Sequence, residues 1–526
     1  MKNLKDLNKL IGAVLGQRRL TIQPFLVLEK GRIEPDSVSV IGNRKIGEAH
    51  LSAKYGKLAS EDIFVTASQG KSIWKRIIRN TSGKTLRLVE LGLRLGGLGF
   101  GKDRKRDFFY NSENPRIYGR MAIPVRLKRT QEMALNSEFD ALAGSRWADP
   151  GVVSERIGAS PYQPFPATLL SNYAVTDGLV HGSLSQRTFY HNHIIKHAGS
   201  AVCWEAYSSC KAVAWREWRP DEVLEDCWYL GLTDEAGSFT SIFAEYADEL
   251  RLRLPAAQGR GRANRRSLLW DSWNDGIHHD IDEPRLLKMA EFIKEELPTV
   301  EWLQIDDGYA TLAKSVKWAH GMGMCFEGDK GLDKKKFPRG LKAFADSVRE
   351  RGLRPAVWIG GLVASDAPLA KAHPEWFSNY DYRLEGRSNP LDISLPEARE
   401  YMQKSLDYFL RESGFEGVKH DFWSYVFEDS HPLLAGKEKT GYEWRTWWLQ
   451  EFRKRLPSDG YLQTGCDIVM GNPFLGEHFN NYRYGIDIGA GKWDHVLTSM
   501  QWGTACFATQ TGDLFIPNSD SIGILP

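Results

Sequence analysis

Two regions of the chain differ in the spacing of their hydrophobic residues. Up to about residue 235, short apolar runs alternate with Gly, Asn, Asp and Ser, a pattern that is typical of β-strands joined by turns. The clearest of these runs are residues 62–66, 86–95, 187–195 and 228–232. A helical spacing over residues 239–252 closes this region. The pattern predicts an N-terminal β-sandwich domain over residues 1–254.

The pattern changes after this region. Residues 255–266 are small, polar and basic, which is the composition of an exposed linker between domains. Over residues 267–526, short strands alternate with amphipathic helices, and this alternation predicts parallel βα units of the α/β class. The expected strands are residues 268–273, 300–306, 354–360, 417–421, 461–466, 482–487 and 514–517.

Polar and aromatic residues end most of these strands. In a (β/α)8-type barrel the carboxyl ends of the strands meet at one mouth, so such endings are the expected layout of an active site. Seven strands can be assigned before the chain stops at Pro526, fewer than a closed barrel needs. We therefore expect a (β/α)-barrel catalytic domain over residues 267–526 that is cut short after strand seven and is incomplete at the C-terminus.

Two of the connecting helices carry distinct signals. Ser394 and Glu397 have the spacing of a capping box, apolar residues between positions 402 and 410 fall on one face, and Gly414 is placed to end this helix. Aromatic residues with helical spacing over residues 442–452 predict a second helix that packs against the barrel.

The composition narrows the functional classes. Lys and Arg total 69 against 67 Asp and Glu, so the net charge of +2 favours neither nucleic acid nor an anionic membrane as a partner. No apolar run approaches the length of a membrane helix, about 18 residues, and no secretory signal is recognised. The 6 Cys are scattered without CxxC pairs, which argues against a zinc ribbon and a disulfide scaffold and favours reduced thiols in a cytoplasmic protein. The 18 Trp and 19 Tyr suit carbohydrate, because flat rings contact the apolar face of a sugar.

Two aspartates at predicted strand ends are candidate catalytic groups. Cleavage of a glycosidic bond needs one carboxylate at the anomeric carbon and one carboxylic acid at the departing oxygen, and Asp421 and Asp487 are our candidates. Lys419 lies two residues before Asp421 on the same strand, so both side chains point to one side and the lysine cation keeps the carboxylate ionised. That environment suits a nucleophile.

Further polar and aromatic residues lie at the ends of the first two barrel strands. The pair Asp306 and Asp307 could accept hydrogen bonds from two adjacent sugar hydroxyls, or could equally bind a divalent metal. Trp273 supplies a ring for stacking on a sugar. We interpret the neighbouring His278 and His279 as an exposed pair in a loop.

These residues resemble the α-galactosidases of glycoside hydrolase families 27 and 36. In that clan an Asp-Asp pair binds the 4- and 6-hydroxyls of galactose, and Asp306 and Asp307 are similar to it. The clan's nucleophile lies in a Lys-x-Asp strand, which Lys419 and Asp421 match. Trp358, in a segment that resembles the clan's third strand, would line the sugar pocket.

The resemblance extends to the later strands. Cys466 and Asp467 are similar to a Cys-acid pair that lies near the sugar 2-hydroxyl in the clan. Arg483 and Asp487 reproduce the spacing around the clan's acid/base. The resemblance therefore implies that Asp487 is the acid/base and that the other three residues contact the substrate.

The resemblance implies retaining hydrolysis of terminal α-galactosyl residues by double displacement, without a cofactor. Asp421 would attack and Asp487 would act as acid and then as base, with their carboxyl groups about 5 to 5.5 Å apart. The expected partner is a galactose-containing oligosaccharide or glycoconjugate, with no nucleic acid or membrane, and a homo-oligomer is left open. Two other functions also stay open: an α-galactosyl transferase of the raffinose-synthase type, and a non-catalytic carbohydrate-binding descendant.

Overall fold

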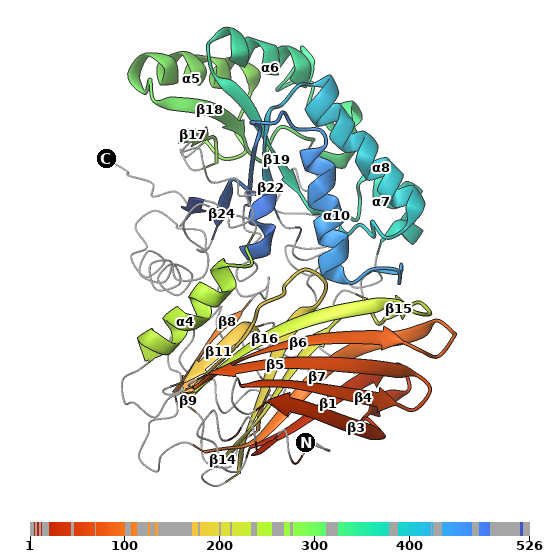
Figure 1. The fold of residues 1–526 in the computed structure, drawn as a ribbon. Coiled ribbons are helices and arrows are strands. Elements are labelled where there is room, and N and C mark those ends of the chain that lie inside the picture. Colours follow the sequence, from red (N-terminus) through yellow and green to blue (C-terminus); the bar gives the residue numbers. More distant parts are fainter. Residues whose placement is uncertain are drawn as a thin grey trace.

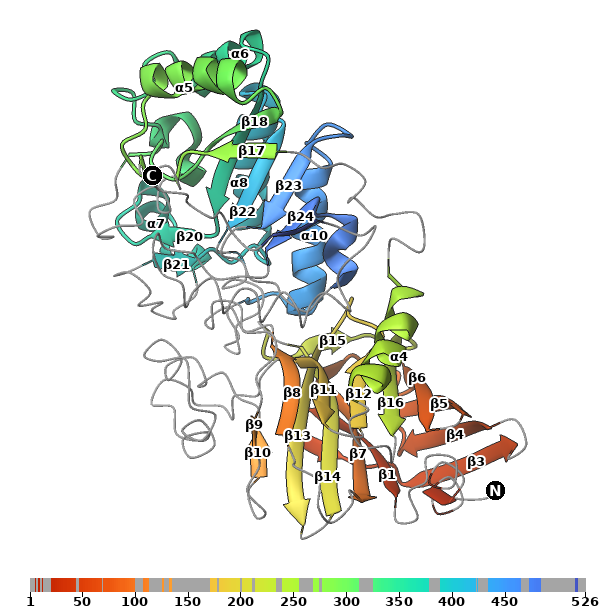
Figure 2. The ribbon, with the colours of Figure 1, turned by 90° about the vertical axis from the view of Figure 1, so that its left-hand side faces the viewer.

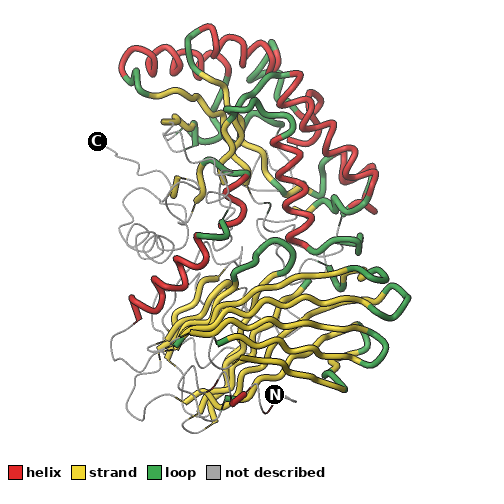
Figure 3. Tube along the Cα trace, viewed as in Figure 1, coloured by secondary structure: helices red, strands yellow, loops and turns green. Residues whose placement is uncertain are grey.

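The protein is built from two kinds of sheet, shown by the computed structural model in Figure 1 and Figure 2. Two antiparallel sheets form the lower part of Figure 1, and a parallel sheet with helices packed on it forms the upper part. Figure 3 shows the same division, with the strands of the lower part in yellow and most helices, in red, above them. The structure describes residues 5, 8, 9, 12, 20–43, 47–68, 70–99, 107–112, 125–126, 132–134, 171–176, 179–198, 201–210, 213–232, 239–254, 268–273, 277–311, 325–377, 388–421, 423, 434–464, 473–483 and 516–518.

The antiparallel sheets lie where the sequence predicts strands joined by turns. One sheet contains, from edge to edge, β10 (Glu132–Ala134), β13 (Tyr190–Ala198), β14 (Ala201–Ser209), β7 (Leu86–Gly99), β1 (Thr21–Leu28) and β2 (Gly31–Ile33), with β15 (Arg216–Trp218) paired to β7. The other contains β3 (Ser37–Asn43), β4 (Glu48–Tyr55), β5 (Ala59–Ser68), β6 (Lys71–Asn80), β16 (Val223–Leu232), β12 (Leu179–Ser183), β11 (Ser171–Thr176), β8 (Asp107–Ser112) and β9 (Val125–Arg126). Buried and more exposed residues alternate along β5 and β6, so each of these strands turns one side to the core.

A helix follows the last antiparallel strand. This helix, α4 (Phe239–Arg251), lies where its hydrophobic spacing predicts. Its buried Tyr246 donates a hydrogen bond to the carbonyl of Ser183 in β12 at 2.9 Å, which attaches the helix to the second sheet. The predicted linker at 255–266 lies outside the described residues, so the domain boundaries stay predictions.

The parallel strands of the upper sheet follow one another in sequence order. They are β17 (Leu268–Asp271), β18 (Val300–Ile305), β19 (Arg354–Gly360), β22 (Gly417–Asp421), β23 (Tyr461–Thr464), β24 (Asn481–Arg483) and β25 (Ile516–Asn518). The bounds of β19 and β22 are those that the sequence predicts, and the other strands overlap their predicted ranges. The described strands form part of a parallel barrel, with β17 and β25 at its two edges.

Helices follow most of the parallel strands in the sequence and pack on the sheet. The longer helices are α5 (Glu283–Glu296), α6 (Gly340–Glu350), α8 (Pro396–Asp407) and α10 (Gly441–Arg453). The shorter segments are η2 (Cys325–Gly331), β20 (Leu362–Ala364), α7 (Pro368–Ala372), η3 (Pro374–Trp376), β21 (Ser388–Pro390), η4 (Tyr408–Glu412) and η5 (Pro473–Glu477). Contacts join α5 to β18 and α6 to β19. Within the described ranges, no helix has both the length and the apolar character that crossing a membrane requires.

The start of α8 differs from its prediction, whereas its end agrees. Ser394 and Glu397 do not form a capping box, and no side chain caps this helix. The Ser394 hydroxyl donates instead to the buried carboxylate of Asp392. This local hydrogen bond replaces the contact that Ser394 would make with the N–H groups at the start of the helix. At the other end, Gly414 terminates the helical turn with a φ of +74°, a backbone conformation that favours glycine.

A capping box forms instead at the start of α10. The Thr440 hydroxyl accepts a hydrogen bond from the Glu443 N–H, and the Glu443 carboxylate accepts one from the Thr440 N–H at 2.8 Å. The same carboxylate pairs with Arg216 of β15 at 2.9 Å. Trp444 and Trp448 of the predicted aromatic face are fully buried. Glu443 therefore fixes both the start of α10 and its attachment to the first antiparallel sheet.

Replacement of Glu443 by alanine is expected to lower the free energy of unfolding by about 1–3 kcal/mol, because it removes both the cap and one of the two carboxylates, with Glu222, that pair with the largely buried Arg216. The matched control is Glu397→Ala, which changes an exposed first-turn glutamate of α8 that makes no cap. The control should change stability by no more than about 0.5 kcal/mol. Urea denaturation of both variants measures the difference, and equal losses would contradict this role of Glu443.

Candidate active site

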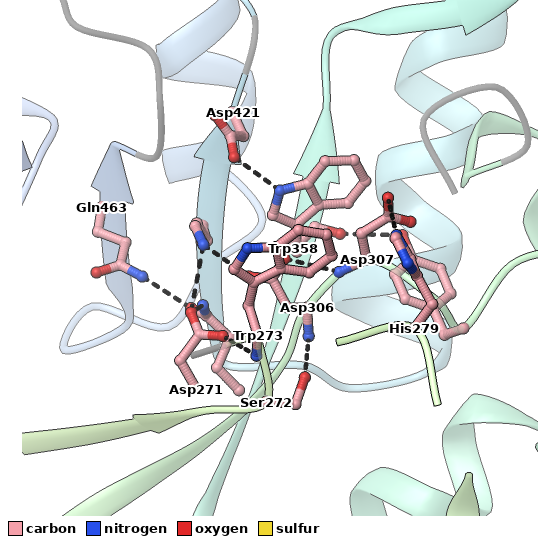
Figure 4. Close-up of polar contacts among 12 residues, drawn as sticks. Asp271, Ser272, Trp273, His279, Asp306, Asp307, Trp358, Asp421 and Gln463 are labelled. Atoms are coloured by element: carbon pink, nitrogen blue, oxygen red, sulfur yellow. Dashed lines mark hydrogen bonds and ion pairs between the residues drawn. The ribbon is translucent and has the colours of Figure 1, made fainter. Parts of the chain in front are cut away.

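Three of the candidate carboxylates, Asp306, Asp307 and Asp421, lie at the carboxyl ends of parallel strands, as the close-up in Figure 4 shows. Asp306 and Asp307 directly follow β18, and Asp421 is the last residue of β22. All three side chains are buried, with 2%, 3% and 3% of their surfaces exposed. Buried carboxylates are costly unless they are paired or hydrogen-bonded, so their partners define what the site can do.

Lys419 supplies the cation at the centre of the described part of the site. Its ammonium lies 2.7 Å from the Asp306 carboxylate and 3.3 Å from the carboxylate of Asp271, the last residue of β17. Burial alone would lower the pKa of Lys419, but the charges of Asp271, Asp306 and Asp421 raise this pKa well above its ordinary value. The lysine is therefore charged at neutral pH, and its ion-pair partners among the described residues lie at the end of β17 and directly after β18.

The Asp306 carboxyl experiences opposing effects. Burial and the nearby negative charge of Asp271 raise the pKa of Asp306 well above its usual range, while the Lys419 ammonium acts in the other direction. One Asp306 oxygen also accepts a hydrogen bond from the Asp307 N–H at 2.8 Å. Asp271 and Asp306 thus share one ammonium, and their oxygens are suited to accept hydrogen bonds from hydroxyl groups.

Asp421 is held by an indole. Trp358 Nε1 donates a hydrogen bond to Asp421 Oδ2 at 2.8 Å, and the Tyr309 hydroxyl donates to the Trp358 carbonyl at 2.9 Å. A Cβ added at Gly360 would lie 2.5 Å from the Trp358 ring, so the ring has this position only because residue 360 is glycine. The Trp358 ring, predicted to line the sugar pocket, therefore also orients the candidate nucleophile.

Asp307 faces an aromatic corner formed by the loop after β17. His279 Nε2 lies 3.4 Å from Asp307 Oδ2, and the Trp273 ring meets the rings of His278 and His279 edge-on at 5.0 and 4.8 Å. His278 is exposed as predicted, but His279 is half-buried, because its ring packs between Trp273 and Asp307. The other carboxylate oxygen of Asp307, Oδ1, is buried and has no hydrogen-bond partner among the described residues.

The sequence predictions missed three polar residues of this site. Asp271, Gln304 and Gln463 join Lys419 in one hydrogen-bonded group, in which the Gln304 amide donates to Asp271 and the Gln463 amide donates to Gln304 at 2.9 Å. Gln304 and Gln463 are buried on parallel strands whose neighbours are mostly apolar. A polar side chain inside such an apolar run was the available signal.

The remaining predicted site residues lie beyond what the structure describes. Cys466, Asp467 and Asp487 fall outside the described residues, and of Arg483 only the backbone, in β24, is described. Their roles, and the predicted spacing of the two catalytic carboxyl groups, stay predictions. Among the described side chains, no group of three or more His, Cys, Asp or Glu residues has a geometry that could hold a metal ion.

Known proteins with similar sequences are α-galactosidases. The Melibiase family model matches residues 233–446. The chain is 25% identical over 176 residues to an α-galactosidase of Escherichia coli, a match that covers 32% of this chain and 23% of the relative. It is 26% identical over 187 residues to α-galactosidase AgaA of Geobacillus stearothermophilus, covering 35% of this chain and 24% of the relative. The matched segments thus span about a quarter of the length of these relatives.

Solved structures of α-galactosidases share the fold. The GH36 α-galactosidase AgaB from Geobacillus stearothermophilus superposes with a TM-score of 0.56 at 15% identity, covering 92% of this chain and 66% of that one. TtGalA, an α-galactosidase from Thermus thermophilus in complex with stachyose, superposes with a TM-score of 0.54 at 17% identity, covering 90% of this chain and 88% of that one. These likenesses show the fold. With the match at residues 233–446, they confirm that the chain resembles the Melibiase family of α-galactosidases.

Proposed function

We propose that the protein hydrolyses terminal α-galactosyl residues of oligosaccharides or glycoconjugates. The observation that carries this proposal is the arrangement of three buried aspartates at the carboxyl ends of the parallel strands. Asp421 is oriented by the Trp358 indole, and Asp306 and Asp307 follow a strand of the same sheet, beside the Lys419 ammonium. A fixed carboxylate beside a group of hydrogen-bond acceptors suits attack on a sugar whose hydroxyls those acceptors hold.

The proposed reaction is a double displacement with retention of configuration. The Asp421 carboxylate attacks the anomeric carbon and forms a covalent glycosyl ester, while the bond to the leaving group breaks and Asp487 gives its proton to the departing oxygen. Asp487 then removes a proton from water while the water oxygen bonds to the anomeric carbon. The ester bond between this carbon and Asp421 breaks, which releases the Asp421 carboxylate. The described contacts of Asp421 support the first half of this scheme; the part of Asp487 rests on the sequence resemblance.

The substrate contacts follow from the chemistry of the described side chains. Asp306 and Asp307 are hydrogen-bond acceptors, and the buried Asp307 Oδ1, which no described residue contacts by a hydrogen bond, is placed to receive a sugar hydroxyl. Lys419 can donate to a sugar oxygen, and Trp273 offers a ring to the apolar face of galactose. Cys466, Asp467 and Arg483 are proposed as further contacts from the resemblance alone.

Two domains are proposed to support this site. Residues 1–254 would form a β-sandwich domain and residues 267–526 the catalytic barrel domain, with 255–266 as the linker. The separate antiparallel and parallel sheets support this division. The contacts of Arg216 with Glu443 and of Arg187 with Glu477 would then join the two domains.

The test is hydrolysis of p-nitrophenyl α-galactoside by the full chain, with the β-galactoside and the α-glucoside as controls. We expect release of nitrophenol from the α-galactoside only, and proton NMR of the first product should show α-galactose before mutarotation. First formation of β-galactose would contradict retention. Saturable binding of galactose without release would favour a binding protein, and products that appear only with added sugar acceptors would favour a transferase.

A further inference from the structure

We propose that Asp271 is a positioning residue that acts through Lys419 on the binding of the galactoside by Asp306. This inference rests on the proposed function. Asp271 ends β17, which is separated from the β22 strand of Lys419 by β18 and β19, and its side chain is only 12% exposed. Because the Lys419 ammonium contacts the carboxylates of both Asp271 and Asp306, a change at Asp271 alters the partner of Asp306 without touching Asp306 itself.

All the described partners of the Asp271 carboxylate are donors. One oxygen accepts a hydrogen bond from the Trp273 N–H at 2.8 Å, and the other accepts from the Gln304 side-chain amide and from the Lys419 ammonium. Both oxygens of Asp271 therefore act as hydrogen-bond acceptors, and three donors from different segments hold the side chain.

The direction of the Gln304 amide is set by the Asp271 carboxylate, which accepts hydrogen bonds, so the Gln304 NH₂ group faces Asp271. The Gln304 oxygen then accepts from the Gln463 NH₂ group at 2.9 Å, and Gln463 Oε1 accepts from the Tyr461 hydroxyl at 3.1 Å. Gln304 and Gln463 are both buried, so this chain of donors is protected from water and holds the Asp271 carboxylate in one orientation.

Sharing of the ammonium has a consequence for substrate binding. Among the residues that the structure describes, the charged groups near Asp306 are Lys419 and Asp421 of β22, Asp271 of β17 and the adjacent Asp307. With the Asp271 carboxylate as a second partner, Lys419 stays paired when Asp306 turns an oxygen toward a sugar hydroxyl. Without the Asp271 charge, Lys419 would bind Asp306 alone and more tightly, and the substrate would have to compete with that pair.

The test is Asp271→Asn in the full chain, with p-nitrophenyl α-galactoside as substrate across a pH series. We expect KM to rise by about tenfold or more while kcat changes by less than about threefold. The charge of Asp271 disfavours ionisation of Asp306, so its removal lowers the pH at which Asp306 ionises. The acid limb of kcat/KM should therefore move to lower pH, an effect that a loss of packing would not cause.

Two further variants complete the test. Asp280→Asn removes an exposed carboxylate of the loop after β17 and should leave KM and the acid limb unchanged. Asp271→Glu keeps the charge, so its acid limb should match that of the parent protein even if KM rises, and this variant decides the question if Asp271→Asn does not fold. The inference would be overturned if Asp271→Asn lowered kcat and left the acid limb of kcat/KM unmoved, or if Asp271→Glu moved that limb. If the parent protein is active, either result refutes only the role of Asp271. If the parent protein neither binds galactose nor releases nitrophenol, the proposed function is refuted as well.

Discussion

Replacement of Asp421 by glycine is expected to lower kcat for p-nitrophenyl α-galactoside by at least about a thousandfold, because the variant lacks the carboxylate that would form the glycosyl ester. Added azide should restore nitrophenol release. A small anion can enter the space left by the side chain, attack the anomeric carbon and displace nitrophenolate in a single step. That step inverts the configuration, so the expected product is β-galactosyl azide, which NMR identifies.

A matched control separates this effect from the loss of any buried aspartate. Asp392 is also buried, at 4% exposure, and accepts hydrogen bonds from Ser394 and from the backbone of Ala435, outside the group around Lys419. Asp392→Asn should lower stability but leave the kcat of the folded protein unchanged and insensitive to azide. Activity of Asp421→Gly within about tenfold of the parent, or formation of the α-azide, would show that Asp421 is not the nucleophile.

The parallel strands were predictable from local pattern because each is short, apolar and followed by a turn or a polar residue. The strand Arg354–Gly360 has buried residues on both faces and is recognised as a continuous apolar run, and Gly417–Asp421 is defined by glycine before it and an acid at its end. Since the carboxyl ends of parallel strands meet at one edge, the positions of Asp306, Asp307 and Asp421 followed from the strand assignment.

The partners of these residues could not be predicted in the same way. Lys419 and Asp271 are 148 positions apart in the chain, and their contact depends on the twist of the sheet and on the length of both side chains. The spacing of Ser394 and Glu397 also could not show that another residue binds the Ser394 hydroxyl. Asp392 accepts this hydrogen bond, and Ser394 does not cap the helix. The sequence predicts an exposed His279, because its contact with Asp307 forms only when the loops after two different strands come together.

Replacement of Lys419 by leucine is expected to lower the free energy of unfolding at pH 8 by about 3–5 kcal/mol, because it leaves buried carboxylates without their cation. Asp271, Asp306 and Asp421 would then repel one another at one end of the sheet. The matched control is Lys342→Leu, which removes an exposed lysine that pairs with Asp346 one helical turn away. Such exposed pairs contribute about 0.3–0.5 kcal/mol, so the control should change stability little.

The pH dependence of the Lys419→Leu variant distinguishes lost charge from lost packing. In the parent protein the pKa of Lys419 is raised, so the stabilisation that the Lys419 charge gives is complete below its ordinary pKa. This stabilisation is lost only as the pH rises through the raised pKa, so it does not change between pH 5 and pH 8. In the variant the carboxyl groups lack their cation, so their folded-state pKa values rise and the folded protein binds more protons than the unfolded chain. The stability deficit should therefore shrink as the pH falls from 8 to 5, which urea denaturation at the two pH values measures. A deficit of equal size at both would mean that Lys419 contributes through the packing of its side chain, and the carboxylates would then need another source of neutralisation.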